Sequence, residues 1–247
     1  MKTVGLLVIH GMGTEREDFD VPFKKGLFRR LRQMGRDPER IAYGKVFWSA
    51  YVNERQRKYV AASRMPPNRL DWMSFRNFVM HNLSDAASYQ RQRGQDNKNY
   101  NLIVRIIQGV VRHIRGELGS DDKPLVIAAH SLGCFVISNY IWDAHKMYAG
   151  QPAQWPEGFS PAGKFEHMVN TSAVITFGCN IPLFVIGHDP VEAVRFPHPD
   201  LADEYKANAQ WHNFYDPDDI LGWPLKTLPY SLDGVKQPAD ASPIRTW

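Results

Sequence analysis

The sequence lacks the features of a disulfide-rich secreted protein and those of a membrane-spanning one. It has two cysteines among 247 residues, too few for a disulfide framework, so we expect a reducing compartment and assign the protein to the cytoplasm. No apolar run reaches about 18 residues, because the best candidate, 126–142, is interrupted by His130, Ser131 and Asn139. The apolar run at 4–9 is too short for a signal peptide. We therefore expect no integral membrane segment.

The sequence also has few signs of a metal, a cofactor or a nucleic-acid partner. It contains no His-x-x-x-His or Cys-x-x-Cys pair, so we expect neither a metal site nor another cofactor.

Residues 1–120 hold 22 Lys and Arg against 11 Asp and Glu, whereas residues 121–247 hold 8 against 15. Such asymmetry can indicate nucleic-acid binding. The basic residues are nevertheless spread through helix-like segments and form no motif of a known nucleic-acid-binding class, so we expect no such partner.

Apolar runs alternate with amphipathic stretches along most of the chain, the pattern of a parallel sheet flanked by helices. Apolar residues at helical spacing predict helices over 19–34, 102–118 and 132–148. Short apolar runs predict strands over 3–9, 41–52, 125–129, 173–177 and 211–215. The run 125–129 is apolar at every residue, which predicts the central strand. We expect a single α/β domain over residues 1–247 with a mostly parallel sheet.

Residues 53–99 do not fit this alternation and predict a helical insertion in the domain. They contain two helix-like stretches separated by Pro66 and Pro67. Their apolar side chains fit a cap over a ligand site, a helical pair on the flank, or a dimer surface. We favour the cap, because a site of the kind proposed below often needs an element that excludes water.

The segment from Val126 to Cys134 carries the strongest chemical signal. A buried strand is followed at once by Ala129-His130-Ser131-Leu132-Gly133 and then by a helix. This pattern is typical of a nucleophile elbow, in which a serine sits at a sharp turn with its hydroxyl above the strand ends. Alanine stands at position 129 where glycine is usual. We predict Ser131 as the nucleophile and the N–H of Leu132 as one oxyanion donor.

A second segment, His10-Gly11-Met12-Gly13, follows the first predicted strand. Glycines on both sides of Met12 allow the backbone to approach a substrate, so the N–H of Met12 is the predicted second oxyanion donor. A phosphate-binding loop is the competing interpretation, but a third glycine and a following Lys-Ser/Thr pair are missing.

Together these two segments resemble the α/β-hydrolase superfamily, in particular lipase- and esterase-like serine hydrolases. The resemblance implies the chain order Ser, then Asp or Glu, then His. It places the acid in the turn after a late strand, where we assign Asp219, with Asp218 and Asp216 as alternatives. It also implies a carboxylic ester or other small-molecule acyl substrate, cleaved through an acyl-enzyme at Ser131.

The chain departs from the family after the acid. None of its nine histidines follows Asp219, and the sequence after Asp219 does not predict the family's C-terminal strand. The natural chain can extend beyond Trp247 and carry the base there. Alternatively, Asp189 can act with His198 or His212, because a triad is defined by geometry rather than order. A third interpretation is a catalytically degenerate binding or scaffold protein with the same fold.

We expect other histidines to have structural rather than catalytic roles. We expect His10 to brace the oxyanion loop and His130 to pack beneath the turn at Ser131. We expect His145, on the helix after Ser131, to lie at the surface or at an interface.

Overall fold

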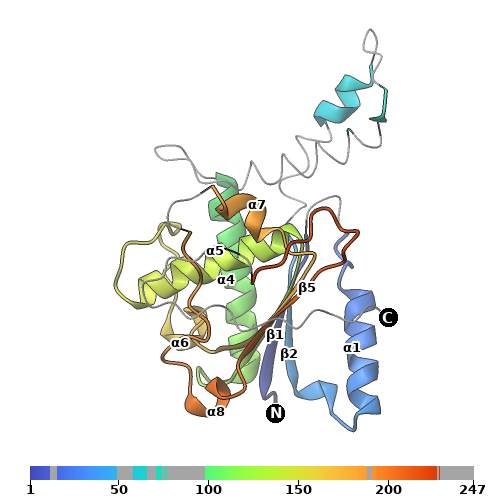
Figure 1. The fold of residues 1–247 in the computed structure, drawn as a ribbon. Helices are drawn as coiled ribbons and strands as arrows, with labels where there is room; N and C mark the ends of the chain where they lie inside the picture. The colour runs from blue at the N-terminus through green and yellow to red at the C-terminus, as the bar shows by residue number, and fades with distance from the viewer. Residues whose placement is uncertain are drawn as a thin grey trace.

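The computed structural model describes residues 1–11, 16–48, 58–65, 71–73, 76, 98–187, 191–226 and 228. Its core is a five-stranded, all-parallel sheet with strand order β2-β1-β3-β4-β5 (Figure 1). The strands are β1 (Val4–Ile9), β2 (Ile41–Val46), β3 (Leu125–His130), β4 (Thr171–Phe177) and β5 (Gln210–Phe214). The α/β class predicted from the alternation of apolar runs is confirmed.

β3 lies at the centre of the sheet, as predicted. It pairs with β1 through the register Ile9↔Ala129 and with β4 through Ala129↔Thr176. Because all strands run parallel, the ends of β1, β3, β4 and β5 and the loops that follow them share one edge of the sheet, here called the carboxyl edge.

Helices cover both faces of the sheet (Figure 1). The longer helices α4 (Lys98–Leu118) and α5 (Leu132–Tyr148) lie on one face, and α1 (Val21–Gln33) lies on the other. Side chains of β1 alternate between the two: Leu7 and Ile9 belong to the larger apolar core, whereas Leu6 and Val8 pack with residues of α1. Shorter helices are η1 (Pro38–Arg40), α6 (Gly163–Glu166), α7 (Ile181–Val185) and α8 (Asp203–Lys206).

Several predicted boundaries are corrected. β2 ends at Val46 rather than at residue 52, and α4 begins at Lys98 rather than at residue 102. In the predicted insertion, residues 58–63 are helical, but most of 53–99 lies outside the described residues, so the cap remains a prediction. Within the described part of the chain, which reaches Leu228, no strand follows β5. No helix among those residues is long and apolar enough to cross a membrane.

Candidate active site

Ser131 alone forms the corner between β3 and α5, since β3 ends at His130 and α5 begins at Leu132. Its backbone has φ 51° and ψ −124°, a conformation that is costly for a residue with a side chain. The Ser131 N–H donates to the carbonyl of Phe177 at the end of β4, at 2.9 Å. This bond ties the strained residue to the neighbouring strand and holds it at the carboxyl edge.

The amino end of α5 faces the same corner. The N–H of Leu132 occupies the first helical position and has no partner within the helix. The first turn carries no acidic residue, so the partial positive charge of the helix end is not neutralised there by its own side chains. An oxygen that gains negative charge next to Ser131 can therefore be stabilised by this N–H.

The loop after β1 packs directly against the corner. A Cβ placed on Gly11 would lie 2.6 Å from the Cβ of Ser131, and one on Gly133 would lie 2.4 Å from the carbonyl oxygen of His10. Both distances are far below normal contact, so the approach of these segments depends on the two glycines. Met12, the predicted second oxyanion donor, lies outside the described residues, and its role stays a prediction.

His10 braces this loop, in agreement with its predicted role. Its Nδ1 lies 2.8 Å from the carbonyl oxygen of Gly11, its Nε2 accepts from the backbone N–H of Trp48 at 3.2 Å, and its ring stacks on Trp48. Burial lowers the pKa of His10 to about 4. Both ring nitrogens are therefore engaged in a neutral imidazole, with the proton on Nδ1, so His10 is unsuited to accept a proton from Ser131.

Asp219 comes from the loop after β5 and reaches the end of β4. Its Oδ1 accepts from the N–H of Leu221 at 3.0 Å. Its Oδ2 lies 2.8 Å from the position that a Cβ would take on Gly178 and 2.7 Å from that on Gly222. Asp219 is half-buried, whereas Asp216 and Asp218 are exposed.

The two alternative acids belong to a surface turn, in which the Asp216 Oδ1 accepts from the N–H of Asp218 at 2.9 Å. Of the three carboxylates considered, Asp219 is the one whose oxygen lies against Gly178, the residue that follows β4.

The prediction that His130 packs beneath the corner is wrong. Its ring is exposed at the carboxyl edge, above β3. Nδ1 lies 3.1 Å from the Cβ position of Gly11, and Nε2 lies 3.9 Å from that of Gly178. The physical reason is the alternation of β3, since His130 lies on the same face as Val126 and Ala128 and is the last residue of the strand. That alternation is visible in the sequence and is the signal that could have placed it.

The histidines considered as alternative bases lie elsewhere. His198 contacts His145, with ring centroids 4.6 Å apart, and also Tyr148, the last residue of α5. At about 1.5 Å per helical residue, this end of α5 is roughly 25 Å from Ser131. Asp189, the acid paired with these histidines in that interpretation, lies outside the described residues.

His212, the other candidate, lies on β5 with its Nε2 2.6 Å from the Oε1 of Gln210. It aligns with Ile175 of β4, which aligns in turn with Ala128 of β3. His212 is therefore two strands away from the strand that carries the corner.

His145 is half-buried on α5, so it lies less at the surface than expected. Burial, followed by the neighbouring His198, lowers its pKa to about 3.

A pocket on the α1 face of the sheet is lined by His130, the residue before the corner, although Ser131 is not among its lining residues. The apolar chains of Val8 and Ala128 line it together with the rings of Phe19, Phe23 and Phe177. Its polar residues are His10, His130 and Asp20, so His130 borders both this cavity and the corner.

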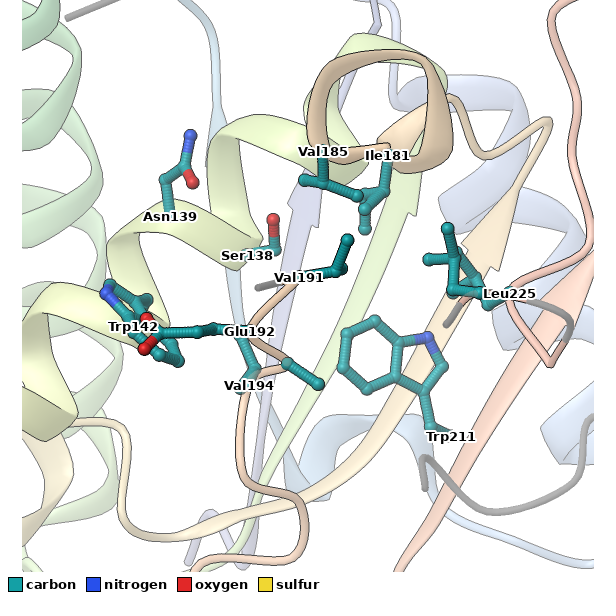
Figure 2. A pocket seen from close by; sticks show the side chains of 12 residues that line it. Ser138, Asn139, Trp142, Ile181, Val185, Val191, Glu192, Val194, Trp211 and Leu225 are labelled. Atoms are coloured by element: carbon teal, nitrogen blue, oxygen red, sulfur yellow. The ribbon is translucent and has the colours of Figure 1, made fainter. Parts of the chain in front are cut away.

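A second pocket lies between α5, α7, residues 191–194 and β5 (Figure 2). Trp142, Val191 and Trp211 give it an apolar lining, and Glu192 and Asn139 supply polar groups. Ser131 is not among its lining residues. The aromatic stack of Phe135 on Phe184, with centroids 4.4 Å apart, lies on the same two helices.

Among the residues described, no group of three or more His, Cys, Asp or Glu side chains is arranged to hold a metal ion. Cys134 and Cys179 are both free and buried. The chemistry available at the carboxyl edge is thus that of a serine hydroxyl, an imidazole, a carboxylate and a helix amino end.

Comparison of the chain with family models, curated proteins and solved structures finds no match.

Proposed function

We propose that this protein is a serine hydrolase that cleaves carboxylic esters through an acyl-enzyme at Ser131. The observation that carries the proposal is the strained corner, where one serine with φ 51° joins the central strand to a helix whose first N–H faces the same point. The order of strands and the position of Asp219 after β5 support a place in the α/β-hydrolase superfamily, among lipase- and esterase-like members.

In the first half-reaction, the Ser131 oxygen attacks the ester carbonyl carbon and its proton passes to a base. The carbonyl oxygen becomes negative and accepts a hydrogen bond from the Leu132 N–H, with the Met12 N–H as the predicted second donor. The alcohol leaves with a proton, and water then releases the acid by the same steps. Asp219 orients and stabilises the protonated base.

The cavity beside the corner fits the proposed substrate class. Three phenylalanine rings, those of Phe19, Phe23 and Phe177, provide an apolar surface for the acyl or alcohol group of a small ester. Among the described residues that line this pocket, Asp20 is the only Asp, Glu, Lys or Arg, and it is already paired with Lys45 at 3.4 Å. An uncharged ester is therefore the substrate that the cavity favours.

The test is covalent labelling of the full chain with a fluorophosphonate, followed by peptide mass spectrometry, together with hydrolysis of 4-nitrophenyl acetate. We expect the wild type to carry the label on Ser131, and we expect Ser131→Ala to show neither labelling nor hydrolysis. Ser138→Ala is the matched control, because Ser138 lies on α5, the helix that follows Ser131, and its hydroxyl donates to the carbonyl of Phe135 at 2.9 Å. A folded wild-type protein with neither label nor hydrolysis would refute the proposal and favour the degenerate scaffold.

A further inference from the structure

The end of β4 contacts both the corner at Ser131 and the loop that carries Asp219. The carbonyl of Phe177, the last residue of β4, accepts the Ser131 N–H at 2.9 Å. The next residue, Gly178, lies against the Asp219 carboxylate, whose Oδ2 is 2.8 Å from the position that a Cβ would take there. Because Phe177 and Gly178 are adjacent, the way in which the loop is attached to β4 determines where the carboxylate lies relative to Ser131.

Residues 219–223, here called the acid loop, begin with a turn that Asp219 stabilises. The Asp219 Oδ1 accepts from the N–H of Leu221 at 3.0 Å. The side chains of Ile220 and Trp223 are 77% and 43% exposed. Burial of these two large side chains therefore holds the loop only weakly, so its hydrogen bonds to the neighbouring strands gain importance.

The backbone of Trp223 is held at both of its polar groups. Its N–H donates to the carbonyl of Cys179, two residues after the end of β4, at 2.8 Å. Its carbonyl accepts from Nδ2 of Asn213, on β5, at 2.9 Å. The second bond is made by a side chain, so it can be removed by a substitution that leaves the acid loop itself unchanged.

Asn213 is itself held in a single orientation. It is only 3% exposed, and its Oδ1 accepts from the hydroxyl of Thr176, its partner on β4, at 2.8 Å. The Thr176 oxygen accepts in turn from Nε1 of Trp211 at 3.3 Å. These bonds determine which end of the amide is the oxygen, so the NH₂ group faces the Trp223 carbonyl. A buried polar network whose members are all paired is rigid, and this one ends on the acid loop.

We propose that Asn213 is a positioning residue for ester hydrolysis, because its amide holds the acid loop where the Asp219 carboxylate lies beside Gly178. The inference rests on the proposed serine hydrolase function and on the role of Asp219 in it. Asn213 is not among the residues that line either pocket, so it acts through Asp219 rather than on the substrate. Without the amide, the Trp223 carbonyl loses its donor and the loop is free to shift. A displacement of about 1 Å in a reacting group can lower a rate about 100-fold.

A buried asparagine can also serve the fold alone, and Asn170 supplies the comparison. It is 5% exposed, and its Nδ2 donates to the carbonyl of Lys123 at 3.2 Å. It directly precedes β4, so it lies at the edge of the sheet opposite to Ser131. Asn170→Ala therefore removes the same kind of bond from the same kind of site without touching the acid loop, which makes it the matched control.

The experiment is a double-mutant cycle on the full chain, with two readouts: the second-order rate of Ser131 labelling by a small fluorophosphonate, and the kinetics of 4-nitrophenyl acetate hydrolysis. Asn213→Ala is expected to lower the labelling rate about 10- to 100-fold, and to lower kcat and kcat/KM equally. Asn170→Ala is expected to stay within about twofold of the wild type in both readouts. In the Asp219→Asn background, Asn213→Ala is expected to cost less than about twofold, because the carboxylate that it positions is already gone.

Urea unfolding identifies the variants that fold. If Asn213→Ala does not fold, Asn213→Asp takes its place in the cycle. It keeps an acceptor for the Thr176 hydroxyl and loses only the N–H donor to the Trp223 carbonyl.

The outcomes separate this inference from the proposed function. If the wild type labels at Ser131 and the folded Asn213 variant labels at the same rate, Asn213 does not position the acid, and the proposed function stands. The inference is also overturned if the Asn213 substitution lowers the rate by the same factor with Asp219 and with Asn at position 219, since a purely structural effect is independent of the carboxylate. If the wild type neither labels nor hydrolyses the ester, the proposed function itself fails, and this inference fails with it.

Discussion

Acid is expected to weaken the fold through His10, the histidine that braces the loop after β1. Its ring stacks on Trp48 with centroids 5.2 Å apart and an angle of 4°, and Nε2 accepts the Trp48 backbone N–H. A proton on Nε2 removes that acceptor and places a charge in an apolar site. Burial is accordingly the main reason that the pKa of His10 falls from 6.5 to about 4.

The sign and size of the effect follow from this shift. Between about pH 6.5 and pH 4 the unfolded chain binds a proton at this residue and the folded chain does not. The free energy of unfolding therefore falls as the pH is lowered through this window, and the loss is complete below about pH 4. Each unit of pKa shift corresponds to about 1.4 kcal/mol. The free energy of unfolding therefore falls by roughly 2 to 3 kcal/mol through His10 when the pH is lowered from 7.5 to 4.5.

The assay is urea unfolding followed by far-UV circular dichroism at the two pH values, for the wild type and for His10→Asn. The variant is expected to be less stable at the higher pH, because it loses the stack on Trp48. On acidification, however, its free energy of unfolding is expected to fall by about 2 to 3 kcal/mol less than that of the wild type. His113→Asn, at an exposed position on α4, is the control and is expected to lose as much as the wild type. His145 also has a lowered pKa, and its contribution cancels in the comparison. Equal losses in the wild type and in His10→Asn would refute the reasoning.

Three further predictions concern backbone strain and buried polar groups. Ser131→Gly is expected to be more stable than Ser131→Ala by about 1 kcal/mol, because glycine tolerates φ 51°; urea unfolding of the two variants checks this. Gly178→Ala is expected to destabilise the protein by about 1 to 3 kcal/mol and to lower esterase activity, since its Cβ would displace the Asp219 carboxylate. Activity equal to wild type in a folded Gly178→Ala would contradict this. Tyr100→Phe is expected to lower the free energy of unfolding by about 1 to 3 kcal/mol, because the hydroxyl donates to the buried carboxylate of Asp143. Thermal unfolding of the variant and the wild type measures this difference.

Much of the fold could be predicted from the order of apolar segments. The run 125–129 has no polar residue, which requires burial on both faces and hence a central strand. The helix after it was predicted with the observed limits, Leu132 and Tyr148, since apolar residues continue at helical spacing between them. The end of β2 could not be predicted in this way, because Phe47 and Trp48 continue the apolar pattern after the strand pairing has stopped at Val46.

The arrangement of the site depends on contacts that local patterns do not encode. Three aspartates follow β5 in a row of four residues, and only the turn geometry distinguishes Asp219 from Asp216 and Asp218. His145 is half-buried and contacts His198, 53 residues away in the sequence, so its surroundings could not be derived from the amphipathic pattern of its own helix. His130 is a different case, since its face of the sheet followed from strand alternation.

The backbone of Ser131 is difficult to explain if the serine merely begins a helix. A serine that caps α5 would take an extended conformation and accept an N–H of the first turn with its side chain. Instead φ is 51° and the side chain makes no capping hydrogen bond. The hydrogen bond to Phe177 and the close packing of Gly11 hold Ser131 in this conformation, which costs about 1 to 3 kcal/mol. Because capping would need none of this, the strained backbone of Ser131 favours the proposed nucleophile role over a simple helix cap.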